Sequence, residues 1–439
     1  MLKTIELLSK EFLQISKEKP IRIISHHDTD GITSAAILLQ TLKRLDKKFS
    51  VRIVKGLDKE IIDQELKRNK NEVLFFTDLA SNSIDSFQDI ENPIFIIDHH
   101  EINRDKLNNK IKIINPHLFN EENICGAALT YLFSKSLSDK NKDLAKLAIM
   151  GMMGDRHETN LSKIYQQIIE DTEDLEIRKS LLIFSATRPL RKSLEYSTAF
   201  IIPGVTNSSA GVMELLKETQ IPSEKTLYEL DEQEISRLVT SIMVRRAMKG
   251  EKEEIIGNIY LLKFFNRKED VRELSVLVNA CSRLGSSDIA LLFCLQNEKA
   301  KERAQEIYAQ YKQELVSALG YADKMETING NGYVILNAGD KIKDTIIGTV
   351  ASILSSSLNH QSGTIFIGMA YNQDKIKVSA RITGKGEKNL KQILEKVVAN
   401  IRAEVGGHQQ AAGCLINKDD EEKFLEALKR NLEIEVVKM

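Results

Sequence analysis

Carboxylate and imidazole side chains gather at the ends of short apolar segments in the first third of the chain. The three segments, with the residues that follow them, are IRIIS-HHDTDG (21–31), VLFFT-D (73–78) and PIFII-DHH (93–100). A further aspartate, Asp155, ends the apolar run LAIMGMMG. Burying such groups together is costly unless a cation compensates their charge. The pattern therefore predicts a cation site.

The kinds of side chain indicate which cation. Because the carboxyl ends of parallel strands meet at one edge of a sheet, we expect the three clusters to converge there. Four aspartates with two or three imidazoles suit one or two Mn²⁺ or Mg²⁺ ions, whereas zinc sites favour thiolates and calcium loops favour oxygen alone. Two such ions can activate a water molecule and stabilise an in-line phosphoryl displacement. Asp78, alone at the end of the central strand, is the candidate for the carboxylate that bridges them.

Single residues of this set have other interpretations. One aspartate at a strand end is more often a helix N-cap than a ligand, but four on one sheet edge favour the metal site. Asp98 is the weakest member, because the carboxylate of the D-H-H triplet can instead orient an imidazole. We interpret His27 and His157 as bystanders.

The elements that must position these residues alternate in type. Apolar β-rich segments are expected at 21–25, 50–54, 72–77, 93–98 and 110–114. Helical spacing of apolar residues occupies 31–48 and 58–69 between them. Continuous apolar strands separated by helices predict an α/β fold whose parallel sheet is covered on both faces.

The rest of the chain divides into three further segments. Residues 160–295 are mainly helical and less regular, and 296–321 form a long, highly charged connecting helix. A smaller α/β domain with resumed strand–helix alternation is expected over 322–439. The first domain then covers 1–159.

Bulk properties restrict the functional class. The 439 residues include 62 Lys and Arg against 63 Asp and Glu, so a nucleic-acid partner would need a local basic surface. Four scattered cysteines without a CxxC pair exclude a zinc ribbon and argue against a disulfide framework. Without an apolar run of membrane-span length, we expect a cytoplasmic protein with no membrane partner.

On these motifs the chain resembles the DHH phosphoesterase superfamily. The four motifs of its first domain are similar to HHDTDG, FTDLA, IDHHE and GMMGD of this sequence. The last segment resembles the DHHA1 domain through SARITG (379–384) and VGGHQQAAG (405–413), although Val405 stands where the family has a glycine. LVNACSRLG (277–285) and the charged helix resemble RecJ exonucleases, and 160–300 resembles archaeal RecJ-like nucleases more than bacterial RecJ.

The resemblance implies two Mn²⁺ (or Mg²⁺) ions that share Asp78. Their ligands would be His26, Asp28 and Asp78 for one ion, and Asp30, Asp78, His99 and Asp155 for the other. His100 would lie near the scissile phosphate and is suited to protonate the leaving group. Asp78 and His100 are thus the residues that we expect to take part in catalysis.

The resemblance also implies a substrate site in the DHHA1 domain. Arg381 and His408 would contact phosphates, Ser379 lies in the same motif, and Gly406 with Gly407 would let the backbone approach an anion closely. Arginine suits a bidentate phosphate contact. The alternative for GGHQQAAG is a tight turn that enters a strand.

Arginines before the connecting helix are candidates for contacts along a nucleic-acid backbone. These are Arg188, Arg191, Arg245, Arg246 and Arg283. Arg283 is the best of them, because it lies in the NACSRLG segment. The alternative for a helix-surface arginine is a solvated face.

The sequence therefore predicts a metal-dependent, single-strand-specific exonuclease of RecJ type that acts on DNA, RNA or both in DNA replication or repair. Bacterial relatives degrade DNA 5′→3′, whereas archaeal relatives include enzymes that act on RNA or from the other end, so polarity stays open. One alternative is a small-nucleotide or oligoribonucleotide phosphodiesterase or phosphatase. Another is a replisome scaffold that binds GINS and the replicative helicase, and GINS is also an expected partner of an active nuclease.

Overall fold

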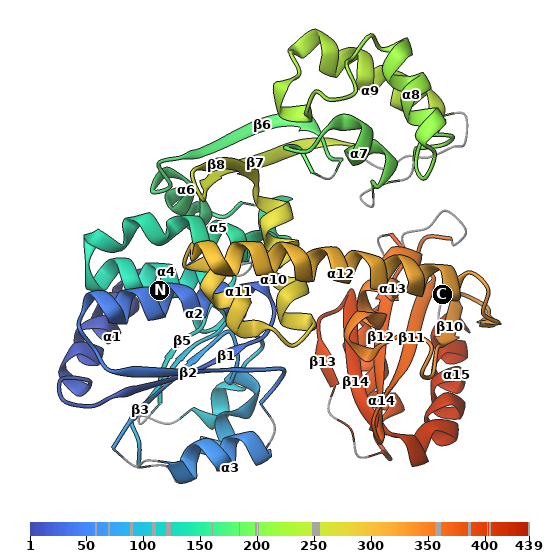
Figure 1. Cartoon of the computed structure of the whole chain (residues 1–439). Coiled ribbons are helices and arrows are strands. Elements are labelled where there is room, and N and C mark those ends of the chain that lie inside the picture. Colours follow the sequence, from blue (N-terminus) through green and yellow to red (C-terminus); the bar gives the residue numbers. More distant parts are fainter. Residues whose placement is uncertain are drawn as a thin grey trace. The chain divides into compact units, whose positions relative to one another are not determined.

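The computed structural model describes residues 1–57, 59–68, 71–87, 91–107, 111–119, 124–159, 161–183, 185–197, 200, 202–247, 255–355, 361–384, 388–401, 403 and 405–437. The chain divides into two compact units, Met1–Tyr308 and Ala309–Met439. The division falls within helix α12 (Glu298–Ala322), the charged segment expected as a connecting helix (Figure 1). Among the described helices, none is both long enough and apolar enough to cross a membrane.

A five-stranded parallel sheet forms the centre of the first unit. Its order is β2-β1-β3-β4-β5, and its strands are β1 (Ile21–His26), β2 (Phe49–Val54), β3 (Val73–Thr77), β4 (Ile94–Ile97) and β5 (Ile111–Ile114). Thr77 pairs with both Ser25 and Ile97, so the carboxyl ends of β1, β3 and β4 lie side by side. The predicted parallel sheet is confirmed. Positions 58, 69, 110 and 160, where expected elements or segments begin or end, lie outside the described residues.

Helices cover both faces of this sheet, as its continuous apolar strands predict. They are α1 (Leu2–Ile15), α2 (Thr29–Arg44), α3 (Lys59–Arg68), α4 (Gly126–Leu137) and α5 (Ala145–Gly154). Figure 1 shows α3 on one face and the other four on the opposite face. On the four-helix face, Phe12 of α1 packs edge-on against Phe75 and Phe95, with ring centroids 5.5 and 5.3 Å apart. On the other face, Phe76 packs against Phe87.

The second part of the first unit is a helical bundle carried on an antiparallel sheet. The sheet has the order β6-β7-β8, with β6 (Leu175–Leu181), β7 (Ile256–Phe264) and β8 (Arg267–Asp270). The helices of this part and those that follow it are α6 (Lys163–Glu170), α7 (Leu190–Glu195), α8 (Ser209–Glu218), α9 (Glu232–Ala247), α10 (Val271–Arg283) and α11 (Ser287–Cys294). A hydrophobic core of its own, from Leu181 to Leu261, holds the bundle together.

This antiparallel sheet was not predicted from the sequence, where the region reads as mainly helical. The turn between β7 and β8 is Phe265–Asn266, both at positive φ (48° and 58°), and it lacks the glycine that marks such hairpins. β6 pairs with a strand about eighty residues further along, Leu175 with Leu262. Local periodicity does not reveal a pairing over that distance.

The second unit is a six-stranded mixed sheet with helices, which confirms the smaller α/β domain. The sheet order is β13-β14-β12-β11-β10-β9, and only β10 and β11 are parallel. Its elements are β9 (Ile328–Gly330), β10 (Tyr333–Asn337), α13 (Asp344–Ser355), β11 (Ile365–Asn372), β12 (Lys375–Ile382), α14 (Leu390–Val397), β13 (Val405–Gly407), β14 (Ala411–Asn417) and α15 (Glu421–Val437). Residues from Tyr333 to Leu432 form its core.

Short 3-10 helices complete the described elements. They are η1 (Ser81–Phe87), η2 (Arg104–Lys106), η3 (Pro116–Phe119), η4 (Asp139–Leu144), η5 (His157–Thr159), η6 (Leu227–Glu229) and η7 (Lys418–Asp420).

Candidate metal centre

The aligned ends of β1, β3 and β4 bring the predicted ligands together. His26 ends β1, Asp78 follows β3, and His99 follows β4. Asp28 is the N-cap of α2, where its Oδ1 accepts a hydrogen bond from the N–H of Gly31. The remaining two are Asp30, in the first turn of α2, and Asp155, at the end of α5.

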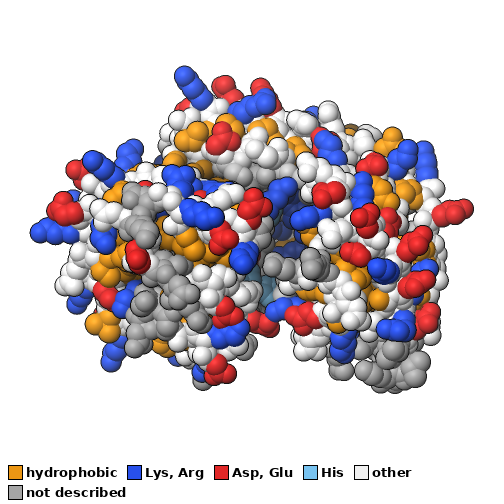
Figure 2. Space-filling view, turned by 90° about the horizontal axis from the view of Figure 1, so that it is seen from below, with side chains coloured by type: hydrophobic (Ala, Val, Ile, Leu, Met, Phe, Trp, Pro, Cys, Tyr) orange, Lys and Arg blue, Asp and Glu red, His pale blue; other side chains and the backbone are white. Residues whose placement is uncertain are grey.

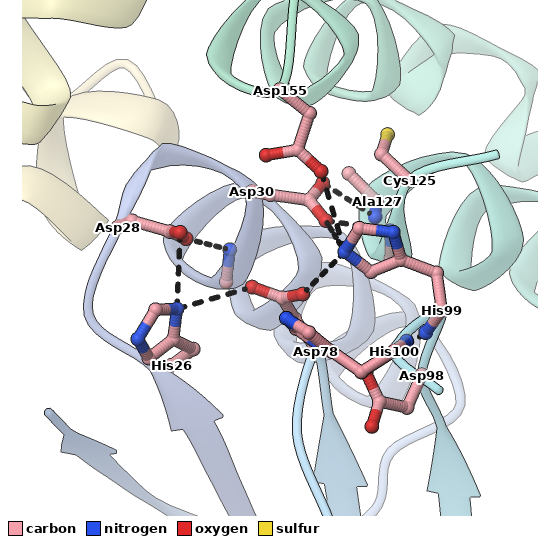
Figure 3. Close-up of polar contacts among 12 residues, drawn as sticks. His26, Asp28, Asp30, Asp78, Asp98, His99, His100, Cys125, Ala127 and Asp155 are labelled. Carbon is pink, nitrogen blue, oxygen red and sulfur yellow. Dashed lines mark hydrogen bonds and ion pairs between the residues drawn. The ribbon is translucent and has the colours of Figure 1, made fainter. Parts of the chain in front are cut away.

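These side chains form two clusters, one around His26 and one around His99, and Asp78 reaches both (Figure 3). A further group of possible ligand atoms joins Asp78 and His99 to His100. In the first, Nδ1 of His26 lies 3.1 Å from Oδ2 of Asp28 and 3.4 Å from Oδ2 of Asp78. In the second, Nε2 of His99 lies 3.2 Å from Oδ1 of Asp78, 3.3 Å from Oδ2 of Asp155 and 3.8 Å from Oδ2 of Asp30. One oxygen of Asp78 therefore faces each cluster.

The donor set fits one or more divalent cations. Four of its buried polar atoms form no hydrogen bond within the described part of the chain: Nδ1 of His26, both carboxylate oxygens of Asp78, and Oδ2 of Asp155. Buried polar atoms in proteins are nearly always hydrogen-bonded, so a group of them in one place needs an explanation. Their chemistry, carboxylate oxygen with imidazole nitrogen, is that of Mn²⁺ or Mg²⁺ ligands.

The electrostatics of the clusters show the same need for positive charge. Burial and the charges of Asp28 and Asp78 raise the pKa of Asp155 to about 7, despite the opposing effect of His99. Burial, Asp155 and Asp78 also raise the pKa of Asp30 well above its ordinary value. Without a metal, burial and the nearby negative charges therefore keep Asp30 and Asp155 protonated to a higher pH than free carboxyl groups. A bound cation would replace those protons.

Asp98 lies outside both clusters and holds His100. Its Oδ1 accepts a 2.7 Å hydrogen bond from Nδ1 of His100, and its Oδ2 accepts one of 2.8 Å from the N–H of Ser81. Burial lowers the pKa of His100, but the charge of Asp98 and this hydrogen bond raise it more, so the net shift is upward. The alternative interpretation of Asp98, as the residue that orients an imidazole, is the arrangement that the structure has.

The backbone around the clusters is strained. Asp78, Ala80 and Arg156 adopt positive φ angles of 57°, 91° and 59°. Each such non-glycine residue costs on the order of 1–3 kcal/mol, less for Asp than for Ala. The N–H of Asp78 donates to the carbonyl of Ile97 at 2.8 Å, which fixes the residue to the end of β4.

The two histidines interpreted as bystanders lie beside the clusters. His27 packs edge-on against His26, with ring centroids 4.6 Å apart, and burial and the neighbouring His26 lower its pKa to about 3. Nδ1 of His157 lies 2.8 Å from the hydroxyl of Tyr165. Neither histidine belongs to a group of metal-ligand atoms among the described residues.

The candidate arginines of the first unit differ in their surroundings. Arg283, at the end of α10, donates from Nε to Asn279 at 3.1 Å. The side chains of Arg188, Arg191 and Arg245 form ion pairs with Glu273, Glu224 and Glu218.

The expectation for Arg246 is wrong. Its side chain is 3% exposed and its guanidinium lies 5.1 Å from the ring centroid of Phe200, so it belongs to the bundle core. Figure 2 shows Lys and Arg interspersed with Asp and Glu over the face that it presents, as the near-zero net charge predicts.

In the second unit, three neighbouring strands bring the two predicted substrate motifs together. Ser379 of β12 pairs with Gly413 of β14, which pairs with Gly406 of β13. Arg381, two residues further along β12, donates from Nε to Oγ of Ser352 at 2.9 Å. His408 follows β13, and its N–H donates to the carbonyl of Ala411 at 2.8 Å.

The two glycines of this motif have different environments. Gly407 has φ +112°, and a Cβ there would lie 2.4 Å from the carbonyl oxygen of Ala411. A Cβ on Gly406 would meet nothing within 4 Å. The turn itself therefore requires glycine at 407 but not at 406.

Some contacts at the candidate metal centre were missed from the sequence. The N–H of Ser81 binds Asp98, and the N–H groups of Gly126 and Ala127 bind Asp30. Main-chain donors carry no residue-type signal. A glycine that opens a helix, as in CGAAL, is the only sequence feature that points to them.

Family models match three parts of the chain. The DHH family N-terminal domain matches residues 20–152, the DHH-CID domain 183–259 and the DHHA1 domain 330–433. The chain therefore belongs to the DHH/DHHA1 superfamily, whose members are phosphoesterases. Its fold is also that of solved RecJ structures.

Individual proteins resemble the chain over most of its length. An uncharacterized protein of Methanocaldococcus jannaschii is 28% identical over 419 residues, 92% of this chain and 91% of that protein. RecJ of Thermus thermophilus, solved with Mn²⁺, has a TM-score of 0.60 at 17% identity and covers 98% of this chain. This chain spans 54% of that RecJ. CDC45 of Entamoeba histolytica has a TM-score of 0.68 at 13% identity, over 98% of this chain and 99% of its own.

Proposed function

We propose that the protein is a divalent-metal-dependent exonuclease that hydrolyses single-stranded DNA or RNA. The observation that carries the proposal is the position of Asp78, whose two oxygens face two separate clusters of ligand atoms. Structures of RecJ with Mn²⁺ and with Mg²⁺ support the choice of ion.

Named residues would divide the work. His26, Asp28 and Asp78 would hold one ion, and Asp30, Asp78, His99 and Asp155 the other. Bound ions supply activation of water and neutralisation of phosphate charge. Because Asp98 occupies Nδ1 of His100, the nitrogen that remains to pass a proton to the leaving oxygen is Nε2.

The second unit would bind the substrate phosphates. Arg381 supplies the cation, and Ser379 and His408 lie in the same two motifs. Gly406 leaves open space beside an edge strand, which suits close approach of a phosphate to its backbone. Arg283 is the candidate for a phosphate contact from the first unit.

The test is hydrolysis of end-labelled single-stranded DNA and RNA with Mn²⁺, comparing Asp78→Ala with Asp46→Ala. Asp46 is a matched control, because it is an exposed aspartate that also has a positive φ (51°). We expect Asp78→Ala to lose more than about 100-fold in rate, beyond what a residue supporting a ligand costs, and Asp46→Ala to lose nothing. Full activity of Asp78→Ala would disprove the two-ion proposal.

The same substrates resolve polarity and length preference. Label placed at either terminus shows from which end degradation starts, and comparing the DNA with the RNA substrate shows which nucleic acid is preferred. Faster turnover of a dinucleotide than of a 20-mer would instead favour a small-nucleotide phosphodiesterase.

A second candidate is a scaffold role in the replisome, supported by the fold likeness to CDC45 over 98% of this chain. Binding of GINS and the replicative helicase is the corresponding measurement. If binding is the function, Asp78→Ala will bind these partners as the unaltered protein does and neither will hydrolyse nucleic acid.

A further inference from the structure

The carboxylate of Asp30 is seated on the N-terminus of helix α4. Its Oδ2 accepts a 2.6 Å hydrogen bond from the N–H of Gly126, and its Oδ1 accepts one of 2.8 Å from the N–H of Ala127. The first N–H groups of a helix lack partners within it and usually bind a nearby capping side chain. The adjacent Cys125 makes no such side-chain bond. Asp30, 96 residues earlier in the chain, takes its place.

Two glycines leave the room for this contact. A Cβ on Gly126 would lie 2.9 Å from Oδ2 of Asp30 and 2.9 Å from the Cβ of Asp78. A Cβ on Gly151, in α5, would lie 2.6 Å from Oδ1 of Asp30 and 2.5 Å from the Cβ of Ala127. Side chains do not approach so closely, so any larger residue would push α4 or α5 away from Asp30.

The carboxylates of the other two candidate ligands near Asp30, Asp78 and Asp155, are held differently. Both oxygens of Asp78 and Oδ2 of Asp155 accept no hydrogen bond in the described part of the chain. Asp30 is thus a carboxylate whose two oxygens are both fixed by the fold itself.

We propose that Gly126 and Gly151 are positioning residues of the metal centre. They let α4 and α5 close on Asp30, and the two backbone N–H groups then hold its carboxylate in place before any ion arrives. Asp30 thereby has two tasks, the cap of α4 and the ligand. The second task rests on the function proposed above, whereas the first does not.

Thermal unfolding in EDTA separates the two tasks through Asp30→Asn and Asp155→Asn. An amide oxygen accepts from only one of the two N–H groups and its NH₂ faces the other, so Asp30→Asn is expected to unfold at a lower temperature than the unaltered protein. Asp155→Asn removes a repelling charge and no hydrogen bond at Oδ2, so its unfolding temperature is expected to stay or rise. Equal increases for both variants would overturn the proposal.

Mn²⁺ affinity, measured by calorimetric titration, tests the glycines through Gly151→Ala and Gly320→Ala. Gly320 is a helical glycine of α12 whose Cβ would meet nothing within 4 Å, so it is the matched control. We expect about a tenfold or larger loss of Mn²⁺ affinity for Gly151→Ala and none for Gly320→Ala. Unchanged affinity of a folded Gly151→Ala would contradict the proposal.

If Gly151→Ala does not fold, the comparison of unfolding temperatures between Asp30→Asn and Asp155→Asn still tests the proposal. It also stands apart from nuclease activity. A protein that hydrolyses no nucleic acid but shows the expected order of unfolding temperatures would refute the proposed function and keep the capping role of Asp30.

Discussion

At the scale of single residues, Asp98 raises the pKa of His100 beside the candidate metal centre. The buried carboxylate binds Nδ1 of the imidazole at 2.7 Å and contributes to the upward shift of its pKa. Without a bound ion, His100 therefore stays protonated to a higher pH than a free histidine. As a proton donor to the leaving group, it would lose this ability only as the pH rises through that raised pKa.

Asp98→Asn is expected to move the alkaline limb of the kcat profile to lower pH. The amide keeps the size of the side chain but removes the negative charge, so the pKa of His100 falls and the proton is lost earlier on the alkaline side. The measurement is kcat against pH at saturating Mn²⁺. An unmoved alkaline limb would show that His100 does not supply the proton.

Residue types and their spacing were enough to predict which side chains gather at the candidate metal centre, because strand ends fix where a side chain emerges. They were not enough to predict the partners of Asp30, which are main-chain N–H groups from a helix distant in sequence. Burial was equally hidden for Arg246, since a single arginine on a helix gives no sign of which side faces the bundle core.

At the scale of elements, the two glycines at the end of β13 have different structural requirements. Gly407 has a positive φ and a carbonyl close to the place of its missing Cβ, whereas Gly406 has open space. Both glycines occur in one motif, and the sequence cannot distinguish them.

Gly407→Ala is expected to destabilise the second unit by about 1–3 kcal/mol, the cost of a strained non-glycine backbone, while Gly406→Ala leaves stability unchanged. If a substrate phosphate approaches the backbone at 406, Gly406→Ala will nevertheless weaken binding of single-stranded DNA. Denaturant unfolding and fluorescence anisotropy measure the two effects. Unchanged DNA binding by Gly406→Ala would exclude close contact at this position.

Parallel and antiparallel elements differed in how well they could be predicted. The parallel sheet can be predicted from continuous apolar strands such as VLFFT, which must be buried on both faces. In the antiparallel sheet, strand β6 is half-exposed and the hairpin turn between β7 and β8 is Phe265–Asn266, so neither apolar periodicity nor turn residues mark the sheet.

At the scale of the whole molecule, the chain has two units with separate hydrophobic cores. All residues of the candidate metal centre belong to the first unit. Binding of an ion to a folded unit stabilises that unit by mass action.

Mn²⁺ is therefore expected to raise the unfolding temperature of the first unit alone. An excess of about 100 times Kd stabilises by about 2.7 kcal/mol, and a calorimetric scan should resolve one transition that moves and one that stays. Asp78→Ala should abolish the shift. If both transitions rise with Mn²⁺, or if only one transition is seen, the two units are coupled in unfolding.

The positive φ angles at Asp78, Ala80 and Arg156 and the crowded carboxylates cost stability, and the proposed hydrolysis would explain why the chain keeps them. A descendant freed from selection for activity would gain stability by neutral replacements at Asp78 or Asp155, and these should disappear early. Asp30 should outlast them, since helix α4 would still depend on it. We therefore expect inactive descendants to keep the aspartate at position 30 after the other candidate ligands are lost.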